Sequence, residues 1–233
     1  MIPLKDENPT KNKCYTRYVI LVICIIVFLI QISSPNSNFL TYYFGFKPAS
    51  FSDEFYKPSF YPMLTLLTSL FMHGGWLHLI GNMMYLLIFA DNVEDILGTK
   101  KFIFFYLFSG FFASLCQAAM DLNSEIPMIG ASGAIAGVLG SYLYYFPKAK
   151  ILVLVPFFIF FTIRVSASIL LIFWFIFQFL NLSNVESSVA WMAHIGGFIF
   201  GYCFSVFYGK KNIPKDGKSI FLKKKIKRTL GLN

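Results

Sequence analysis

Charged residues are scarce in this chain. Asp, Glu, Lys and Arg make up 13% of its 233 residues, whereas 57% are hydrophobic and 19% are aromatic. Soluble domains carry about 25% charged residues, so a chain of this composition cannot hide its apolar surface in one aqueous core. We therefore expect a multi-span membrane protein whose lipid-facing surface is rich in Phe.

Metal-binding and disulfide patterns are also lacking. The four cysteines (Cys14, Cys24, Cys116, Cys203) are scattered, and no pair has a metal-ligand spacing. The three histidines form no His-Glu-x-x-His motif and have no nearby carboxylate ligand. We expect no metal and no cofactor, with zinc or haem bound between histidines as the weaker alternatives.

Apolar runs predict six helices, at about residues 18–32, 76–90, 101–120, 132–145, 168–182 and 189–208. No small-residue cleavage site follows the first run, which is therefore interpreted as a retained span rather than a signal peptide. The aromatic connection 36–75 is expected to lie in the membrane interface. The connection 148–167 is expected to do the same, because its apolar part is shorter than the roughly 20 residues of a span. The predicted fold class is all-α, a polytopic six-transmembrane-helix bundle.

The net charge of +9 follows the membrane topology and does not indicate nucleic acid binding. If both termini are inside, Lys47 and Lys57 are the only basic residues expected outside, which is a strong positive-inside bias. The expected organisation is a cytoplasmic tail (1–17), a membrane domain (18–208) and a basic cytoplasmic tail (209–233). The basic cluster Lys223–Arg228 is expected to rest on anionic lipid. We expect a multi-pass protein of the bacterial cytoplasmic membrane.

Small residues recur four positions apart on two of the predicted helices. Gly133 and Gly137 lie on the fourth helix, and Gly197 and Gly201 lie on the sixth. This spacing lets two helix backbones approach closely. We therefore expect the fourth and sixth helices to be in contact.

A few polar residues fall within the predicted spans. Ser132 begins the fourth helix, His194 lies on the sixth, and His78 and Asn82 share one face of the second. Each has a structural explanation, because a membrane serine bonds back to a carbonyl and His or Asn side chains join helices. Intramembrane ionisable residues nevertheless indicate functional sites by default.

A catalytic interpretation uses all four residues together. A serine hydroxyl needs a base to take its proton, and His194 could be that base if its helix contacts the fourth. The Ser132 amide, free at a helix start, together with His78 and Asn82, would supply donors to an oxyanion. Acidic residues are expected only in loops (Glu94, Asp95, Asp121, Glu125), so the prediction is a dyad rather than a triad.

Three motifs in this order resemble the rhomboid intramembrane serine proteases. They are His73-x4-His78-x3-Asn82, Gly130-Ala131-Ser132-Gly133 and Ala193-His194-x-Gly196-Gly197. The resemblance implies Ser132 as nucleophile, His194 as general base, and an oxyanion site of His78, Asn82 and the Ser132 amide. It also implies that Gly130 belongs to the Gly-x-Ser-Gly signature, that His73 helps build the active-site entrance, and that a water-filled cavity opens to the outside.

The chain departs from many rhomboids at one place. Where they have a Trp-Arg pair in the first loop, this sequence reads Met-Leu-Thr-Leu-Leu over residues 63–67. The resemblance therefore says less about the membrane contacts of that loop.

The expected function is hydrolysis of peptide bonds in or near transmembrane segments of other membrane proteins. Substrates should be extended at the cut, with helix-destabilising Gly or Pro and a small side chain beside it. Access is expected past the fifth helix, where Phe173 and Trp174 could form a gate or could simply face lipid. Two alternatives remain: a non-catalytic rhomboid-like protein that escorts membrane proteins, and a small transporter lined by His78, Asn82 and His194.

Overall fold

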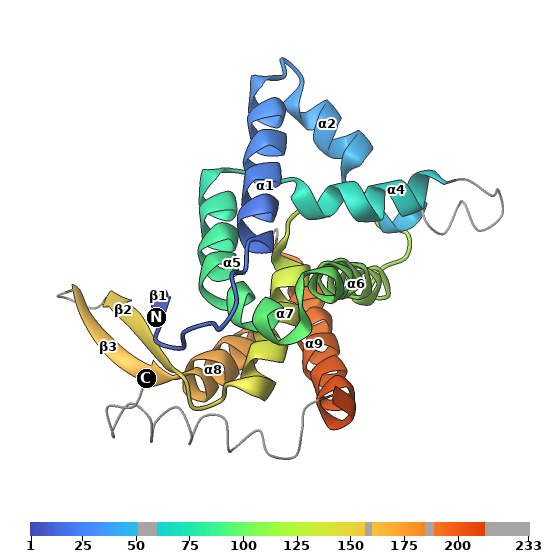
Figure 1. The fold of residues 1–233 in the computed structure, drawn as a ribbon. Coiled ribbons are helices and arrows are strands. Elements are labelled where there is room, and N and C mark those ends of the chain that lie inside the picture. Colours follow the sequence, from blue (N-terminus) through green and yellow to red (C-terminus); the bar gives the residue numbers. More distant parts are fainter. Residues whose placement is uncertain (51–59, 157–159, 185–188, 213–233) are drawn as a thin grey trace, which may run out of the picture.

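The computed structural model describes residues 1–50, 60–156, 160–184 and 189–212 (Figure 1). Six apolar helices follow one another in the predicted order: α1 (Thr16–Ser33), α5 (Trp76–Leu97), α6 (Thr99–Ala118), α7 (Ser132–Tyr145), α8 (Ala167–Leu180) and α9 (Trp191–Asn212). In the part of the chain that is described, α1, α6 and α9 are long and apolar enough to cross a membrane, and α5 qualifies together with the helical segment before it. The prediction of a membrane protein built mainly from helices is confirmed.

Helix α7 lies at the centre of the molecule, between α5, α6 and α9 (Figure 1). Its ten consecutive residues from Gly133 to Tyr142 are all buried. A helix that is surrounded by other helices needs no polar face, which explains why its sequence is small and apolar all round. Ser132 therefore starts the most enclosed helix of the fold.

The connection 36–75, which we expected to be an interfacial loop, is largely helical where it is described. It contains α2 (Ser37–Phe44), α4 (Tyr61–Thr68) and the 3₁₀ turn η1 (Ser69–Phe71). The segment formed by α4 and η1 meets α5 at an angle of 83°. Exposed aromatic side chains on α2 and before α4 remain compatible with an interfacial position (Phe39, Tyr42, Tyr43, Phe60).

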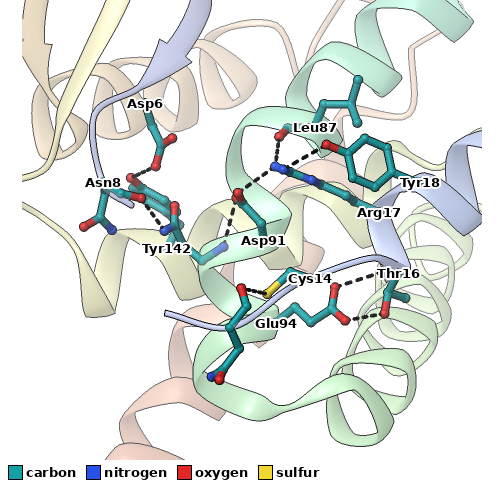
Figure 2. A network of polar contacts seen from close by, with 12 residues as sticks. Asp6, Asn8, Cys14, Thr16, Arg17, Tyr18, Leu87, Asp91, Glu94 and Tyr142 are labelled. Atoms are coloured by element: carbon teal, nitrogen blue, oxygen red, sulfur yellow. Dashed lines mark hydrogen bonds and ion pairs between the residues drawn. The ribbon is translucent and has the colours of Figure 1, made fainter. Parts of the chain in front are cut away.

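Helix α5 continues to Leu97, past the polar residues that were predicted to end it. The acidic side chains of Asp91 and Glu94 in its last turns are paired with residues at the start of α1 (Figure 2). The Glu94 carboxylate accepts hydrogen bonds from the Thr16 hydroxyl (2.6 Å) and the Thr16 amide (3.1 Å). Asp91 forms an ion pair with Arg17 (2.7 Å). The prediction of a loop at residues 91–95 was wrong, because these carboxylates find partners from a distant part of the chain.

The all-α prediction also needs correction, because the chain contains a small antiparallel sheet. Its order is β1 (Ile2–Asp6), β2 (Lys150–Pro156) and β3 (Phe160–Ser166). Strand β2 alternates, with Ile151 and Val153 fully buried against the helical core, as expected for a strand with one covered face. The predicted interfacial connection 148–167 is therefore a hairpin that leads directly into α8.

The first residues of the chain are likewise not a free tail. Asp6 pairs with Ile151 in the sheet and accepts a hydrogen bond from the Tyr142 hydroxyl at 2.9 Å (Figure 2). Burial raises the pKa of Asp6 to about 6, although the Tyr142 hydrogen bond opposes this shift. Glu7 forms an ion pair with Arg164 of β3 at 2.6 Å. The basic cluster Lys223–Arg228 lies outside the described residues.

Candidate active site

The contact between α7 and α9 is as close as their glycines permit, and the predicted contact is confirmed. A Cβ atom added to Gly197 would overlap the carbonyl of Gly133, and one added to Gly201 would overlap the carbonyl of Gly137. Each glycine pair lets one backbone lie directly on the other. The two helices that carry Ser132 and His194 are thus held together near both residues.

Ser132 is the first residue of α7, and His194 lies in the first turn of α9. A Cβ atom added to Gly133 would lie 3.9 Å from the Ala193 carbonyl, so the backbones next to Ser132 and His194 are close to one another. Both residues are partly exposed. No hydrogen bond joins Ser132 to His194 in the described chain. Catalytic hydrogen bonds are often long before substrate binds.

A cavity of about 30 Å³ lies beside Ser132. Its walls come from η1, α6, the starts of α7 and α9 and the segments just before those two helices. Small residues dominate them (Ser69, Gly110, Ala113, Ser114, Gly130, Gly133, Ala190, Ala193). A single water needs about 10–15 Å³ on this measure. The space next to the hydroxyl therefore admits a small group but not a large side chain.

His78 and Asn82 both face the backbone just before Ser132. A Cβ atom added to Gly130 would lie 2.8 Å from His78 Nε2 and 3.7 Å from Asn82 Nδ2. Gly130 also has a φ of 129°, which side chains other than hydrogen rarely allow. The His78 Nδ1 atom accepts a weak bond from the Gly74 amide (3.4 Å), so Nε2 carries the proton and is a donor aimed toward Gly130.

The His73 imidazole is a hydrogen-bond partner of the Asn82 side chain. The Asn82 amide lies 3.0 Å from His73 Nε2, and His73 is only 2% exposed. Gln31 of α1 holds the backbone of His73 at both its amide (3.1 Å) and its carbonyl (3.3 Å). The structure shows a buried His73 side chain next to Asn82, and its role at the active-site entrance stays a prediction.

The start of α7 offers further donors. The amides of Ser132 and Gly133 donate to no backbone carbonyl within the described residues, as expected for the first turn of a helix. These amides and the His78 imidazole come from different elements, α7 and α5. Together they place several neutral donors around the Ser132 side chain, which could stabilise a developing negative charge.

His194 has a partner that the sequence reasoning missed. Its Nδ1 atom lies 2.8 Å from Oε1 of Gln178 on α8. The Trp174 ring, also on α8, lies against the imidazole, with centroids 5.8 Å apart. The signal in the sequence was the Gln178 amide, the single amide side chain of a mainly apolar helix. Buried polar groups in membrane helices need partners, so this residue could have been singled out.

The two expected gate residues point to different surroundings. Phe173 is 56% exposed, whereas Trp174 is partly buried against His194 and Phe198. The acidic residues of α5 lie away from the candidate site. Asp95 contacts the segment before α1 and Glu94 contacts Thr16, the first residue of α1, so both lie at the opposite end of α5 from His78. Within the described chain, the polar partner of the His194 side chain is an amide and not a carboxylate.

Comparison with known proteins gives a consistent result. The family model described as "Rhomboid domain" matches residues 62–211. The chain is 30% identical over 226 residues to "Rhomboid protease GluP" of Bacillus subtilis, covering 92% of this chain and 40% of that protein. It is 32% identical over 144 residues to "RHOMBOID-like protein 6, mitochondrial" of Arabidopsis thaliana, covering 59% and 41%. The chain spans about two fifths of the length of these curated relatives.

Proposed function

The chain belongs to the rhomboid family, and from this premise we propose that it is an intramembrane serine endopeptidase with a Ser132-His194 dyad. One observation supports the proposal: the glycine contact between α7 and α9 brings the two helix backbones together close to Ser132 and His194. A small cavity lies beside Ser132, and the His78 and Asn82 side chains lie near Gly130, two residues before it.

The proposed reaction uses these groups in sequence. Nε2 of His194 takes the proton of Ser132 while Oγ attacks the substrate carbonyl carbon. The Ser132 amide and the His78 imidazole donate to the oxyanion, and the second amide proton of Asn82 is free to do the same because the other faces His73. Protonated His194 then gives its proton to the departing amine. Water, deprotonated by His194, releases the acyl group from Ser132.

The cavity beside Ser132 supports a preference for substrates with a small side chain at the cut. Its volume of about 30 Å³ suits Gly, Ala or Ser but not an aromatic ring. The substrate must also be extended there, since a helix hides its carbonyls. Transmembrane segments that contain Gly or Pro near the cut are therefore the proposed substrates.

The distribution of charge supports the topology that we propose. The sheet, the end of α7 and the acidic end of α5 lie together, and the basic residues Lys100, Lys101, Lys148, Lys150 and Arg164 lie on elements that meet there. The positive-inside rule makes this end cytoplasmic. Ser132, at the other end of α7, would then face the outside of a bacterial cytoplasmic membrane, with six spans and both termini inside.

The test is cleavage of a model transmembrane substrate by the purified protein in detergent. Wild type should cleave the substrate and react with a fluorophosphonate, whereas Ser132→Ala should do neither. His194→Ala should lose cleavage by about 10³-fold or more. Cleavage that survives Ser132→Ala would refute this serine as nucleophile.

A non-catalytic escort protein remains the second candidate. It is favoured by one observation, the lack of a hydrogen bond between Ser132 and His194 in the described structure. Under this alternative the wild-type protein would bind a transmembrane segment without cleaving it and would not react with the fluorophosphonate. Equal binding by wild type and Ser132→Ala, with no product from either, would establish it.

A further inference from the structure

We propose that Gln178 is a positioning residue for His194 and determines which nitrogen of the imidazole is available to Ser132. The inference rests on the proposed function, because it adds a third residue to the same site. Gln178 lies on α8 and is 3% exposed. Its amide makes two hydrogen bonds, one to His194 and one within its own helix.

The second hydrogen bond fixes the orientation of the amide. Nε2 of Gln178 donates to the backbone carbonyl of Trp174 at 2.8 Å. A carbonyl oxygen can only accept, so the amide nitrogen must face Trp174 and the amide oxygen must face His194. The opposite orientation would bring two acceptors together and leave a buried group unsatisfied.

The orientation of the amide in turn fixes the tautomer of His194. Oε1 of Gln178 only accepts, so Nδ1 of His194, 2.8 Å away, carries the proton. In a neutral imidazole the lone pair then lies on Nε2, which is the nitrogen that a general base must present to Ser132. Trp174 lies against one side of the ring, and Trp191 approaches with its edge at a centroid distance of 6.1 Å. The ring is therefore restrained in both tautomer and plane.

An amide suits this position better than a carboxylate would. A charged group inside the membrane is costly, whereas a neutral amide orients the imidazole without that cost. Cysteine proteases of the Cys-His-Asn type use an amide in the same role. The acceptor is weaker than a carboxylate, so a smaller contribution to the rate is expected than in a Ser-His-Asp triad.

A purely structural role for Gln178, joining α8 to α9, makes different predictions. The chain offers a matched control for that role. Gln117 on α6 accepts a hydrogen bond from the Ala193 amide at 3.2 Å. It therefore joins α6 to the same turn of α9 without touching the imidazole. Gln117→Leu removes a helix-joining amide, whereas Gln178→Leu removes both a helix-joining amide and the partner of Nδ1.

The experiment measures the tautomer and the rate in the same proteins. Full-length wild type, Gln178→Leu and Gln117→Leu are prepared with ¹⁵N-labelled histidine, and His194→Asn identifies the His194 signals. We expect the wild-type signal to report a proton on Nδ1, and Gln178→Leu to move it toward Nε2. The same variant should lower kcat by about 10-fold to 100-fold with little change in KM. Gln117→Leu should leave the tautomer unchanged and kcat within about 3-fold.

Restoring an acceptor provides a second test. Gln178→Glu should return the proton to Nδ1, and its negative charge should move the acid limb of the kcat profile to higher pH. If Gln178→Leu does not fold, the shift of the acid limb in Gln178→Glu is the measurement that tests the proposal. The proposal is overturned if the tautomer is the same in folded Gln178→Leu as in wild type, or if Gln117→Leu shifts it equally. If wild type cleaves nothing, the proposed function fails, but the tautomer comparison still decides the role of Gln178.

Discussion

The two ends of the helical core solve the problem of buried polar groups differently. At the Ser132 end the polar side chains are three imidazoles and the amides of Asn82 and Gln178, and backbone amides add further uncharged donors. At the opposite end, Arg17 at the start of α1 forms an ion pair with Asp91, and the Glu94 carboxylate accepts a hydrogen bond from the Thr16 hydroxyl (Figure 2). Charge is placed where it is paired and near the expected membrane surface. The neutral end keeps a serine hydroxyl and donors unpaired, as a site needs, without a buried charge.

The comparison predicts that the largest effect comes from separating α7 and α9. Gly197→Ala places a Cβ atom on the Gly133 carbonyl, so the helices must shift at the level of Ser132. We expect a loss of about 1–3 kcal/mol in the free energy of unfolding and a fall in cleavage of about 100-fold or more. Both are measured on protein in detergent, by thermal unfolding and by substrate cleavage.

Gly81→Ala is the matched control for that substitution. Gly81 lies on α5, and a Cβ atom there would meet nothing within 4 Å. Alanine also favours a helix over glycine by about 1 kcal/mol, so stability should stay the same or rise. Equal damage from the two substitutions would show that close packing of α7 on α9 is not what positions the site.

At the charged end, removal of Glu94 should affect stability more than chemistry. Glu94 is 2% exposed and accepts hydrogen bonds from Thr16 and from the Thr99 hydroxyl (2.9 Å). Glu94→Ala leaves those donors buried and unpaired, at a cost of about 1–3 kcal/mol. Cleavage per folded molecule should change by less than about 3-fold. The amount of folded protein is taken as the fraction that reacts with the fluorophosphonate. A fall in cleavage per folded molecule well beyond about 3-fold would show that the charged end of α5 is coupled to the candidate active site.

The docking of β1 should depend on pH through Asp6. Its pKa in the folded protein is raised to about 6 from 3.8, so the folded state holds the proton more tightly than the unfolded state. The stabilisation is fully present below about pH 4 and is lost as pH rises through 6. Because Asp6 is partly exposed, the effect should be about 1 kcal/mol or less. The protection factors of the β1 amides, which remove the intrinsic pH dependence of hydrogen exchange, should be higher at pH 5 than at pH 7, and Asp6→Asn should abolish this difference in protection.

The smallest effect is expected at the ion pair between Glu7 and Arg164. Both side chains are well exposed, at 39% and 64%, and pairs of this kind contribute about 0–1 kcal/mol. A double-mutant cycle with Glu7→Gln and Arg164→Gln should give a coupling energy of about 0.5 kcal/mol or less, falling with added salt. A coupling above about 2 kcal/mol would mean that the sheet is held mainly by charge.

Features that depend on local pattern were predictable from the sequence. The order of the six apolar helices, the bounds of α7 and its contact with α9 all follow from apolar runs and from glycines four residues apart. The same small-residue pattern brought Ser132 and His194 toward one another. The rhomboid resemblance in three motifs is confirmed by the family match.

Features that depend on distant partners could not be predicted. Asp91 and Glu94 looked like the end of a helix, because the sequence does not reveal that Arg17 and Thr16 satisfy them. The apolar run at 151–155 fits a strand only when β1 and β3 are there to pair with it. Gln178 gave a signal, one amide in an apolar helix, but its partner lies on another helix.

The pairing of β1 with β2 sets an order of events during synthesis. Strand β1 leaves the ribosome before its partner strand β2, whose Ile151 follows only after α1, α5, α6 and α7 have been made. Until then its edge is unpaired, and contacts between such distant segments form late. Completion of the sheet therefore requires that α1, α5, α6 and α7 have already been made, and a fusion that keeps β1 from pairing would act on this later stage of assembly rather than on the first.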